Sequence, residues 1–213
     1  MRWLTDKRAS LKLARMRSVL SVSELSPGEF AARLDQMIAV YAAAMRPPAD
    51  MLPGRRSIMA VHAAQPGFRA LLATEDGSGR PAGFGYGFHG ARGQWWHDTV
   101  ARGLAATHGT AAAAAWLDDS FEVAELHVAP GHQGHGVGAG LLLRLTSDRP
   151  ERTAMLSTRD ADSPARRLYR GLGFADLLTA YHFPGAPVPY AVMGAALPLR
   201  PGESGRPSSR SNW

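Results

Sequence analysis

The sequence predicts a single domain of the mixed α/β class, and three observations support this prediction. First, 213 residues with 45% apolar content are enough to enclose one hydrophobic core. Second, strand-like apolar runs alternate with segments whose apolar residues recur at helical spacing. Third, a strand-like run at 121–129 leads into closely spaced glycines and then an apolar helix. Strands joined by helices in this way form a sheet covered by helices.

The N-terminal part of this domain predicts one strand followed by two helices. Residues 18–24 form the strand. Ser26-Pro27-Gly28-Glu29 is a capping box with proline at the first helical position. An amphipathic helix follows until Arg46-Pro47-Pro48 ends it, and residues 50–65 form a second, short helix. The apolar positions of the first helix are Phe30, Leu34, Met37, Ile38, Tyr41 and Met45.

Two further strands, 68–74 and 81–89, are joined by a turn at 75–80 that is rich in Gly, Asp and Ser. In the second strand glycines alternate with aromatic residues, so one face is aromatic and the other is bare. A bare face means either close approach of a ligand or backbone, or tight packing. The glycines are Gly83, Gly85 and Gly87, and the aromatic residues are Phe84, Tyr86 and Phe88.

Residues 90–120 are too long for a simple connection and predict a helical insert, with a helix in the alanine-rich run Ala111 to Leu117. The adjacent Trp95 and Trp96 have two interpretations. They either form the wall of an acceptor pocket or anchor the insert in the core.

The C-terminal part repeats the alternation of strands and helices. Ser163 is a natural N-cap with Pro164 behind it, and Gly173 suits the position just after a helix. A last antiparallel pair surrounds the sequence from Pro184 to Pro187. The predicted ranges are strand 121–129, helix 135–147, strand 152–159, a helix from 163 and strands 174–183 and 188–197.

The net charge of +6 is concentrated at the two ends of the chain. Residues 1–17 carry +5 and residues 200–213 carry +2, so the body at 18–199 is close to neutral at −1. Basic arms can bind nucleic acid, but a neutral body argues against that function. We therefore expect a flexible basic extension at 1–17, the domain at 18–199 and a disordered tail at 200–213 rich in Pro, Ser and Arg.

The chain contains no cysteine, which excludes disulfides, thiolate metal sites and a cysteine nucleophile. No apolar run approaches the ~20 residues that span a membrane. The first seventeen residues lack the apolar core of a secretory signal. These features predict a cytoplasmic protein.

The glycine-rich loop at 133–138 predicts a site for a phosphate-bearing ligand, because a helix N-terminus offers free backbone N–H groups. A phosphate loop of the Walker type needs a lysine that the loop lacks. A dinucleotide fingerprint matches at Gly134-x-Gly136-x-x-Ala139, with Asp160 ending the next strand. However, residues 130–133 separate strand from glycines, and the chain after Asp160 is too short for the rest of that fold.

A third interpretation uses two motifs together. Gln133-x-x-Gly136-x-Gly138 and, thirty residues on, Ser163-Pro-Ala-Arg-Arg-Leu-Tyr-Arg-Gly-Leu-Gly-Phe174 resemble the GNAT superfamily of acyl-CoA-dependent N-acetyltransferases. The resemblance covers about residues 121–175. It implies a mixed, mostly antiparallel seven-stranded sheet flanked by helices on both faces. Two central strands of that sheet diverge, and the pantetheine arm of acyl-CoA lies between them.

The resemblance also implies an activity, namely direct transfer of an acetyl group from acetyl-CoA to an amine in a ternary complex. Tyr169 would be the acid that protonates the leaving thiolate, and the Val128 N–H would polarise the acetyl carbonyl. Ser163 stands where Asn is common in the family, and His135 where Arg is common. The residues expected to bind acetyl-CoA are Leu126, His127, Val128, Gln133, Gly134, His135, Gly136, Val137, Gly138, Ser163 and Tyr169.

The general base has three candidates on the strand at 121–129, namely Glu125, Glu122 and His127. Simple alternation puts Glu122 on one face and both Glu125 and His127 on the other. Members of the family often carry a bulge here that resets the faces. A metal site formed by His127, His132 and His135 is disfavoured, because no Asp, Glu or Cys completes a chelating pattern.

Two alternatives to the enzyme remain, a non-catalytic acyl-CoA-binding sensor and a nucleic-acid-associated protein that uses its basic arms. The sequence does not identify the amine acceptor. The late strand pair could support a homodimer.

Overall fold

The computed structural model describes residues 20–200. The expected extension at 1–17 lies outside this range, as does the expected tail apart from Arg200. Within residues 20–200 no helix is both long enough and apolar enough to cross a membrane.

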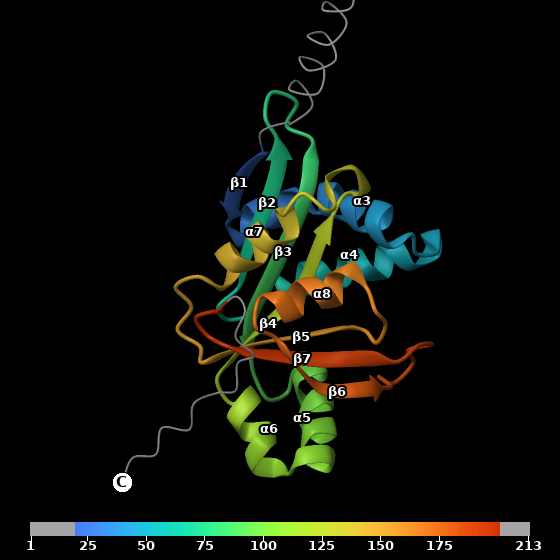
Figure 1. The fold of residues 1–213 in the computed structure, drawn as a ribbon. Coiled ribbons are helices and arrows are strands. Elements are labelled where there is room, and N and C mark those ends of the chain that lie inside the picture. Colours follow the sequence, from blue (N-terminus) through green and yellow to red (C-terminus); the bar gives the residue numbers. More distant parts are fainter. Residues whose placement is uncertain (1–19, 201–213) are drawn as a thin grey trace, which may run out of the picture.

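The described chain forms one seven-stranded sheet with helices on both faces, as predicted (Figure 1). The strand order is β1-β2-β3-β4-β5-β7-β6, and every neighbouring pair is antiparallel except β4 with β5. The sheet is therefore mixed and mostly antiparallel. The strands are β1 (Leu20–Leu25), β2 (Arg69–Glu75), β3 (Pro81–Gly90), β4 (Ser120–Val128), β5 (Thr153–Arg159), β6 (Ala175–Tyr181) and β7 (Tyr190–Ala196).

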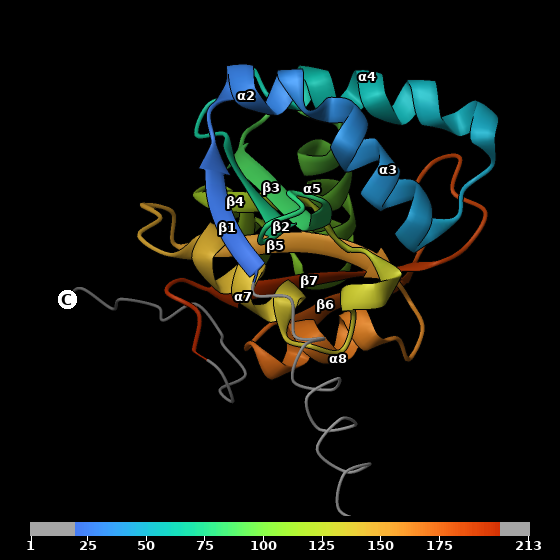
Figure 2. The same ribbon diagram turned by 90° about the horizontal axis from the view of Figure 1, so that it is seen from above.

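Seven α-helices and two 3-10 helices are described, and Figure 2 shows the sheet between two groups of them. One face is covered by α7 (Val137–Thr146) and α8 (Pro164–Gly171), which pack on a shared core of Leu, Val and Ala side chains. The other face carries two separate cores. The first of these cores lies under α2 (Pro27–Ala32), α3 (Leu34–Met45) and α4 (Leu52–His62). The second lies under α5 (Trp95–His108) and α6 (Thr110–Leu117). The two 3-10 helices are η1 (Ala49–Met51) and η2 (Pro130–His132).

The predicted N-terminal caps are confirmed. The Ser26 hydroxyl accepts from the Glu29 N–H, and the Glu29 carboxylate accepts from the Ser26 N–H at 2.8 Å. The single helix expected behind this box is instead two helices. Arg33 leaves helical geometry at φ −110° and separates α2 from α3. The end before Pro47 is as predicted, with Arg46 in the left-handed region at φ 49°.

The insert holds two helices where the alanine-rich run predicted one. Gly109, at φ 87° and ψ 159°, is the residue that both ends α5 and precedes α6. Residues other than glycine rarely adopt such a φ, so Gly109 fixes the corner between the two helices.

The bare face of β3 is explained by tight packing. A Cβ added to Gly87 would lie 2.3 Å from the Glu122 carbonyl oxygen and 2.5 Å from Phe121 Cζ. At Gly83 the same atom would lie 2.9 Å from the His127 carbonyl oxygen. The missing side chains let β3, β4 and α7 approach each other closely, and the aromatic residues of β3 fill the core on the opposite face.

Candidate active site

The sheet is forked between β4 and β5. These parallel strands pair only at Ser120–Thr153, Phe121–Ala154 and Glu122–Met155. Beyond Glu122 and Met155, β4 runs on to Val128 and β5 to Arg159 without pairing. The divergence of two central strands is therefore confirmed, and it leaves a free backbone edge inside the sheet.

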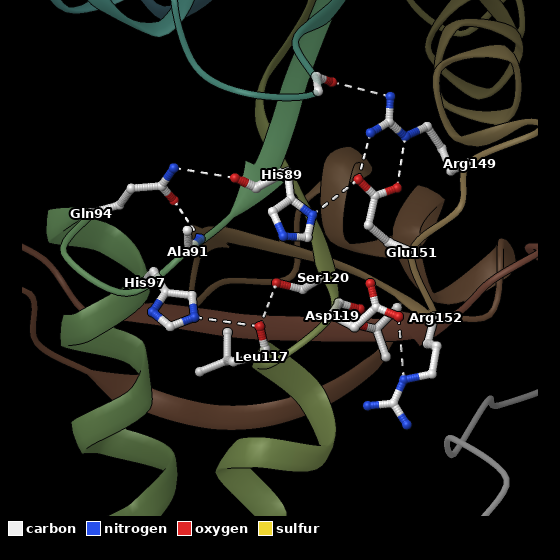
Figure 3. A network of polar contacts seen from close by, with 12 residues as sticks. His89, Ala91, Gln94, His97, Leu117, Asp119, Ser120, Arg149, Glu151 and Arg152 are labelled. Carbon is white, nitrogen blue, oxygen red and sulfur yellow. Dashed lines mark hydrogen bonds and ion pairs between the residues drawn. The ribbon is translucent and has the colours of Figure 1, made fainter.

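The closed end of the fork is fixed by a polar network (Figure 3). The Arg149 guanidinium lies 4.3 Å from the centre of the Phe121 ring and forms an ion pair with the buried Glu151 carboxylate. His89 Nδ1 lies 3.3 Å from the same carboxylate, and Arg149 also donates to the Gly67 carbonyl at 3.1 Å. The network joins β3 to the loops before β2 and β5, and thereby holds the strands together where they pair.

The insert also contributes to the closed end. The Thr153 hydroxyl donates to the Trp116 carbonyl at 2.7 Å, and the Ser120 hydroxyl donates to the Leu117 carbonyl at 3.1 Å. An open hollow of about 340 Å³ lies beside this network and is lined by His89, His97, Arg92 and Asp118 among others. It is at the opposite end of β4 from the glycine loop.

The glycine loop connects the open end of β4 to α7. Gly134 and Gly136 have φ of 75° and 82°, which explains why glycine stands at both positions. Gly136 is the N-cap of α7 and no side chain caps this helix, so its first N–H groups face outward. Gln133 folds back and its amide donates to the Val128 carbonyl at 2.9 Å. The helix begins at Val137, two residues later than predicted, because the loop residues are left-handed.

The free edge of β4 presents the backbone of Leu126 and the N–H of Val128, whose carbonyl already accepts from Gln133. The Ala129 N–H donates to the Ala82 carbonyl on β3 at 2.8 Å. Backbone groups of successive strand residues point to opposite edges, so the Val128 N–H points away from β3. The same alternation turns the Leu126 N–H to the open gap and the His127 backbone toward β3.

Simple alternation along β4 placed Glu122 and Glu125 on opposite faces of the strand, and a bulge in β4 makes this expectation wrong. The β3–β4 register passes from Tyr86–Glu125 to Gly87–Val123, so Ala124 is an extra residue. An extra residue resets the alternation of side chains. Glu122 and Glu125 therefore lie on the same face, and both act electrostatically on the Tyr86 hydroxyl from the side covered by α3 and α4.

Glu125 is buried, with two cationic or polar partners. Its Oε1 accepts from Arg55 Nη1 at 2.7 Å, and its Oε2 contacts His127 Nε2. Burial alone would raise the pKa of Glu125, but the hydrogen bond to His127 and the charges of His127 and Arg55 outweigh it and lower the pKa. The carboxylate is therefore held ionised. The His127 ring packs edge-on against Tyr41, at 5.1 Å between centres.

Glu122 has the opposite environment. It is 5% exposed, and its Oε2 has no hydrogen-bond partner within residues 20–200. Burial raises the pKa of Glu122 to about 8. This carboxyl group is therefore largely protonated at neutral pH and sits at the last residue pair before the fork opens.

Tyr169 reaches the fork from the other face. Ser163 caps α8 as predicted, its hydroxyl accepting from the Arg166 N–H, and Gly173 ends the helix at φ 94°. Phe174 then packs on the Tyr169 ring at 5.9 Å between centres. Burial, and next the negative charge of Glu125, raise the pKa of Tyr169 to about 12. The negative charge of Glu125 on β4 therefore acts on the Tyr169 hydroxyl of α8 across the fork.

The loop histidines have separate roles. His132 Nε2 lies 2.9 Å from Glu75 Oε1 at the end of β2, whereas His135 is exposed on the loop. Within residues 20–200 no group of three or more His, Cys, Asp or Glu side chains is placed to hold a metal ion.

Residues 67–176 match the family model of the GNAT acetyltransferase domain. The chain is also 36% identical over 200 residues to a GCN5-like protein acetyltransferase of Mycobacterium tuberculosis, covering 83% of this chain and 97% of that one. This chain belongs to the GNAT family of acetyltransferases.

Solved structures of proteins named as acetyltransferases share the fold at low sequence identity. The ribosomal-protein-S18-alanine N-acetyltransferase of Escherichia coli has a TM-score of 0.58 at 16% identity, over 92% of this chain and 99% of that one. A Salmonella typhimurium protein, solved with its cofactor acetyl-CoA, has a TM-score of 0.55 at 16% identity, over 84% and 95%.

Two residues of this site, Arg55 and His62, could not be recognised from the sequence. Tyr86 was noted there only as an aromatic residue of its strand, without a role in the site. His62 Nδ1 lies 3.0 Å from the Tyr86 hydroxyl, and burial lowers the pKa of His62. Arg55 and His62 are seven residues apart on α4 and therefore share a face. That spacing was visible in the sequence, but it pointed to no partner on β4.

Proposed function

We propose that this GNAT acetyltransferase moves the acetyl group of acetyl-CoA directly to an amine of a protein, with both substrates bound together. The observation that carries this proposal is the fork, in which an unpaired backbone edge, Tyr169 and two glutamates meet. Acetyl-CoA as donor is supported by family membership. A protein as acceptor is supported by the name of the mycobacterial relative.

In this proposal the phosphates bind to the backbone of the glycine loop. Gly134 and Gly136 leave room for close approach, whereas Gly138 packs closely against Leu168, and the uncapped N-terminus of α7 supplies N–H donors and the positive end of the helix dipole. Val137 and Gln133 complete the loop. We expect Ser163, the N-cap of α8, and the exposed His135 to contact the ligand more weakly than the backbone of the loop.

The acetyl group would lie at the fork, where backbone donors are already oriented. The pantetheine arm pairs with the free edge at Leu126 and Val128, next to His127. The Val128 N–H then donates to the thioester carbonyl oxygen as it becomes an oxyanion, and such a donor contributes about 2.7–4 kcal/mol in the transition state. The Tyr169 hydroxyl makes no hydrogen bond within residues 20–200, and it donates its proton to the departing sulfur.

The two glutamates take different roles. Glu125 remains ionised because Arg55 and His127 hold it, so it is a weak base and attracts the cationic acceptor amine. Glu122 has a pKa of about 8 and an unpartnered oxygen, which suits proton removal near neutral pH. We therefore assign the proton acceptor to Glu122, directly or through water, and expect kcat/KM to rise with pH through about 8.

The proposal is tested by calorimetric titration with acetyl-CoA, with free CoA and NAD as comparators, followed by thiol release with a panel of amines and peptides. Micromolar binding of acetyl-CoA without NAD binding, together with thiol release that depends on an amine, is the expected result. Binding without any release would instead favour the non-catalytic sensor. Absence of acetyl-CoA binding would overturn both functions.

A further inference from the structure

Exposed apolar side chains are concentrated at one place on the described surface. Six large apolar residues between 20 and 200 are exposed, and five of them lie on or beside α3 and α4 or at the start of α5. Exposed large apolar side chains that gather on one part of a surface are typical of interaction sites. The five are Met45, Met51, Ile58, Val61 and Trp95, and the sixth is Leu143 on α7.

Three of these residues form a stripe along one flank of α4. Met51 is the N-cap residue just before α4 and already has helical backbone angles; Ile58 follows it by seven residues, and Val61 follows Ile58 by three. The three therefore lie in a row along the helix, and their exposed fractions are 57%, 47% and 62%. We call this row the α4 stripe. The inner side of the same helix is packed by the fully buried Met59.

The flank that carries the α4 stripe is the one next to the fork. Arg56 donates to Asp35 of α3 at 2.8 Å, so its side of α4 faces α3. Arg55 turns inward to Glu125. An α-helix turns by about 100° per residue, which places Arg56 on one side of Arg55 and Ile58 on the other. The α4 stripe is therefore turned away from α3 and runs beside Arg55, the residue that contacts Glu125 at the fork.

Trp95 extends this surface across the start of α5. Gln94, just before it, donates to Gln65 just after α4 at 3.0 Å, so the end of α4 meets the start of α5. The Trp95 ring is 60% exposed and lies 5.8 Å from the Phe183 ring. Figures 1 and 2 both place the β6–β7 connection, which contains Phe183, on the same side of the molecule as the α3–α4 connection.

We infer that the α4 stripe and Trp95 form the docking surface for a polypeptide acceptor, whose apolar side chains flank the residue that bears the amine. This inference rests on the proposed function, because it takes the fork as the place of transfer. A chain that inserts one amine into the fork must lay its neighbouring residues on the surface beside it. A small amine would not reach the stripe.

A second copy of this chain fits the surface less well than a transient substrate. A stable dimer buries roughly 800 Å² on each partner, and three stripe residues with one tryptophan supply a fraction of that area. Short-lived enzyme–substrate contacts use smaller patches. The continuity of the stripe with the fork also favours the acceptor.

The test measures peptide binding by fluorescence anisotropy on protein saturated with CoA. The probes are two labelled nonapeptides with a central lysine, one flanked by leucines and one by serines. We compare wild type with the double variant I58E/V61E, with W95A, and with the matched control L143E, which changes the exposed apolar residue of α7. The leucine peptide should bind wild type and L143E at least tenfold more tightly than it binds I58E/V61E or W95A.

Three outcomes would overturn the docking surface. These are equal binding of the two peptides to wild type, binding that survives in both I58E/V61E and W95A, and a dimer in sedimentation that I58E/V61E dissociates. Thiol release with a small amine such as butylamine is followed on the same samples. Butylamine turnover that stays within twofold in I58E/V61E shows that the fork is intact. If wild type does not turn over butylamine, the proposed transferase activity fails. The peptide-binding measurement does not depend on turnover, so it still tests the docking surface.

Discussion

Replacement of Glu122 by glutamine should remove a large part of the pH dependence of stability. The pKa of Glu122 is raised from 4.5 to about 8 by burial, and each unit corresponds to about 1.4 kcal/mol. Because the folded state binds this proton more tightly than the unfolded chain, the stabilisation is complete below about pH 4.5. It is lost as the pH rises through about 8.

The size of the effect follows from the two pKa values. Between about pH 5.5 and 8.5 this one group should lower the free energy of unfolding of the wild type by about 3 kcal/mol. Glu122→Gln keeps the shape of the side chain and lacks the ionisation. Its stability relative to wild type should therefore improve by about 3 kcal/mol over that range.

The assay is urea unfolding followed by tryptophan fluorescence at a series of pH values. The pKa of Glu125 on the same strand is lowered by His127 and Arg55 in spite of burial, so its carboxylate stays ionised throughout this range and adds no slope of its own. A wild-type to Glu122→Gln difference that is constant from pH 5.5 to 8.5 would refute the reasoning, since it would mean that Glu122 is already ionised in the fold.

Three other substitutions probe the donor site and the closed end of the fork. Tyr169→Phe should lower kcat by about 10²-fold with an unchanged Kd for acetyl-CoA by calorimetry; a change under twofold would exclude Tyr169 as the acid. Gly136→Ala forces alanine to φ 82°, so we expect at least tenfold weaker acetyl-CoA binding and about 1–2 kcal/mol less stability, whereas Gly140→Ala within α7 should be neutral or stabilising. Arg149→Met removes the guanidinium partner of the buried Glu151 and leaves only the longer contact with His89, so denaturant unfolding should show a loss of about 3 kcal/mol; an unchanged midpoint would contradict a stabilising role of this network at the closed end.

Features set by neighbouring residues were predictable from the sequence. The caps at Ser26 and Ser163, the stop at Arg46 and the glycine loop in front of a helix depend on a few adjacent residues. Local backbone preferences are strong at such positions, so the pattern of residue types determines the conformation. The order of strands and helices followed from the same patterns, together with the family resemblance.

Features set by distant partners were not predictable. Arg55 meets Glu125 across 70 positions of the chain, and no local pattern in α4 indicates this partner. The bulge at Ala124 leaves the apolar pattern of β4 intact while it moves Glu125 to the face of Glu122. The break at Arg33 and the corner at Gly109 likewise depend on how the helices fit onto the sheet.

The free backbone edge at Leu126 and Val128 has a consequence for solubility. Unpaired strand edges usually lie at the border of a sheet, where they can recruit strands of other molecules and start aggregation. Here the unpaired edge lies between two strands of the same sheet, with α7 and α8 on one face and α3 and α4 on the other. A strand of a foreign protein, which brings bulky side chains on both faces, is excluded by this enclosure. A slender, amide-bearing arm can still pair with the edge, so the protein keeps open hydrogen-bonding groups without the risk of polymerisation.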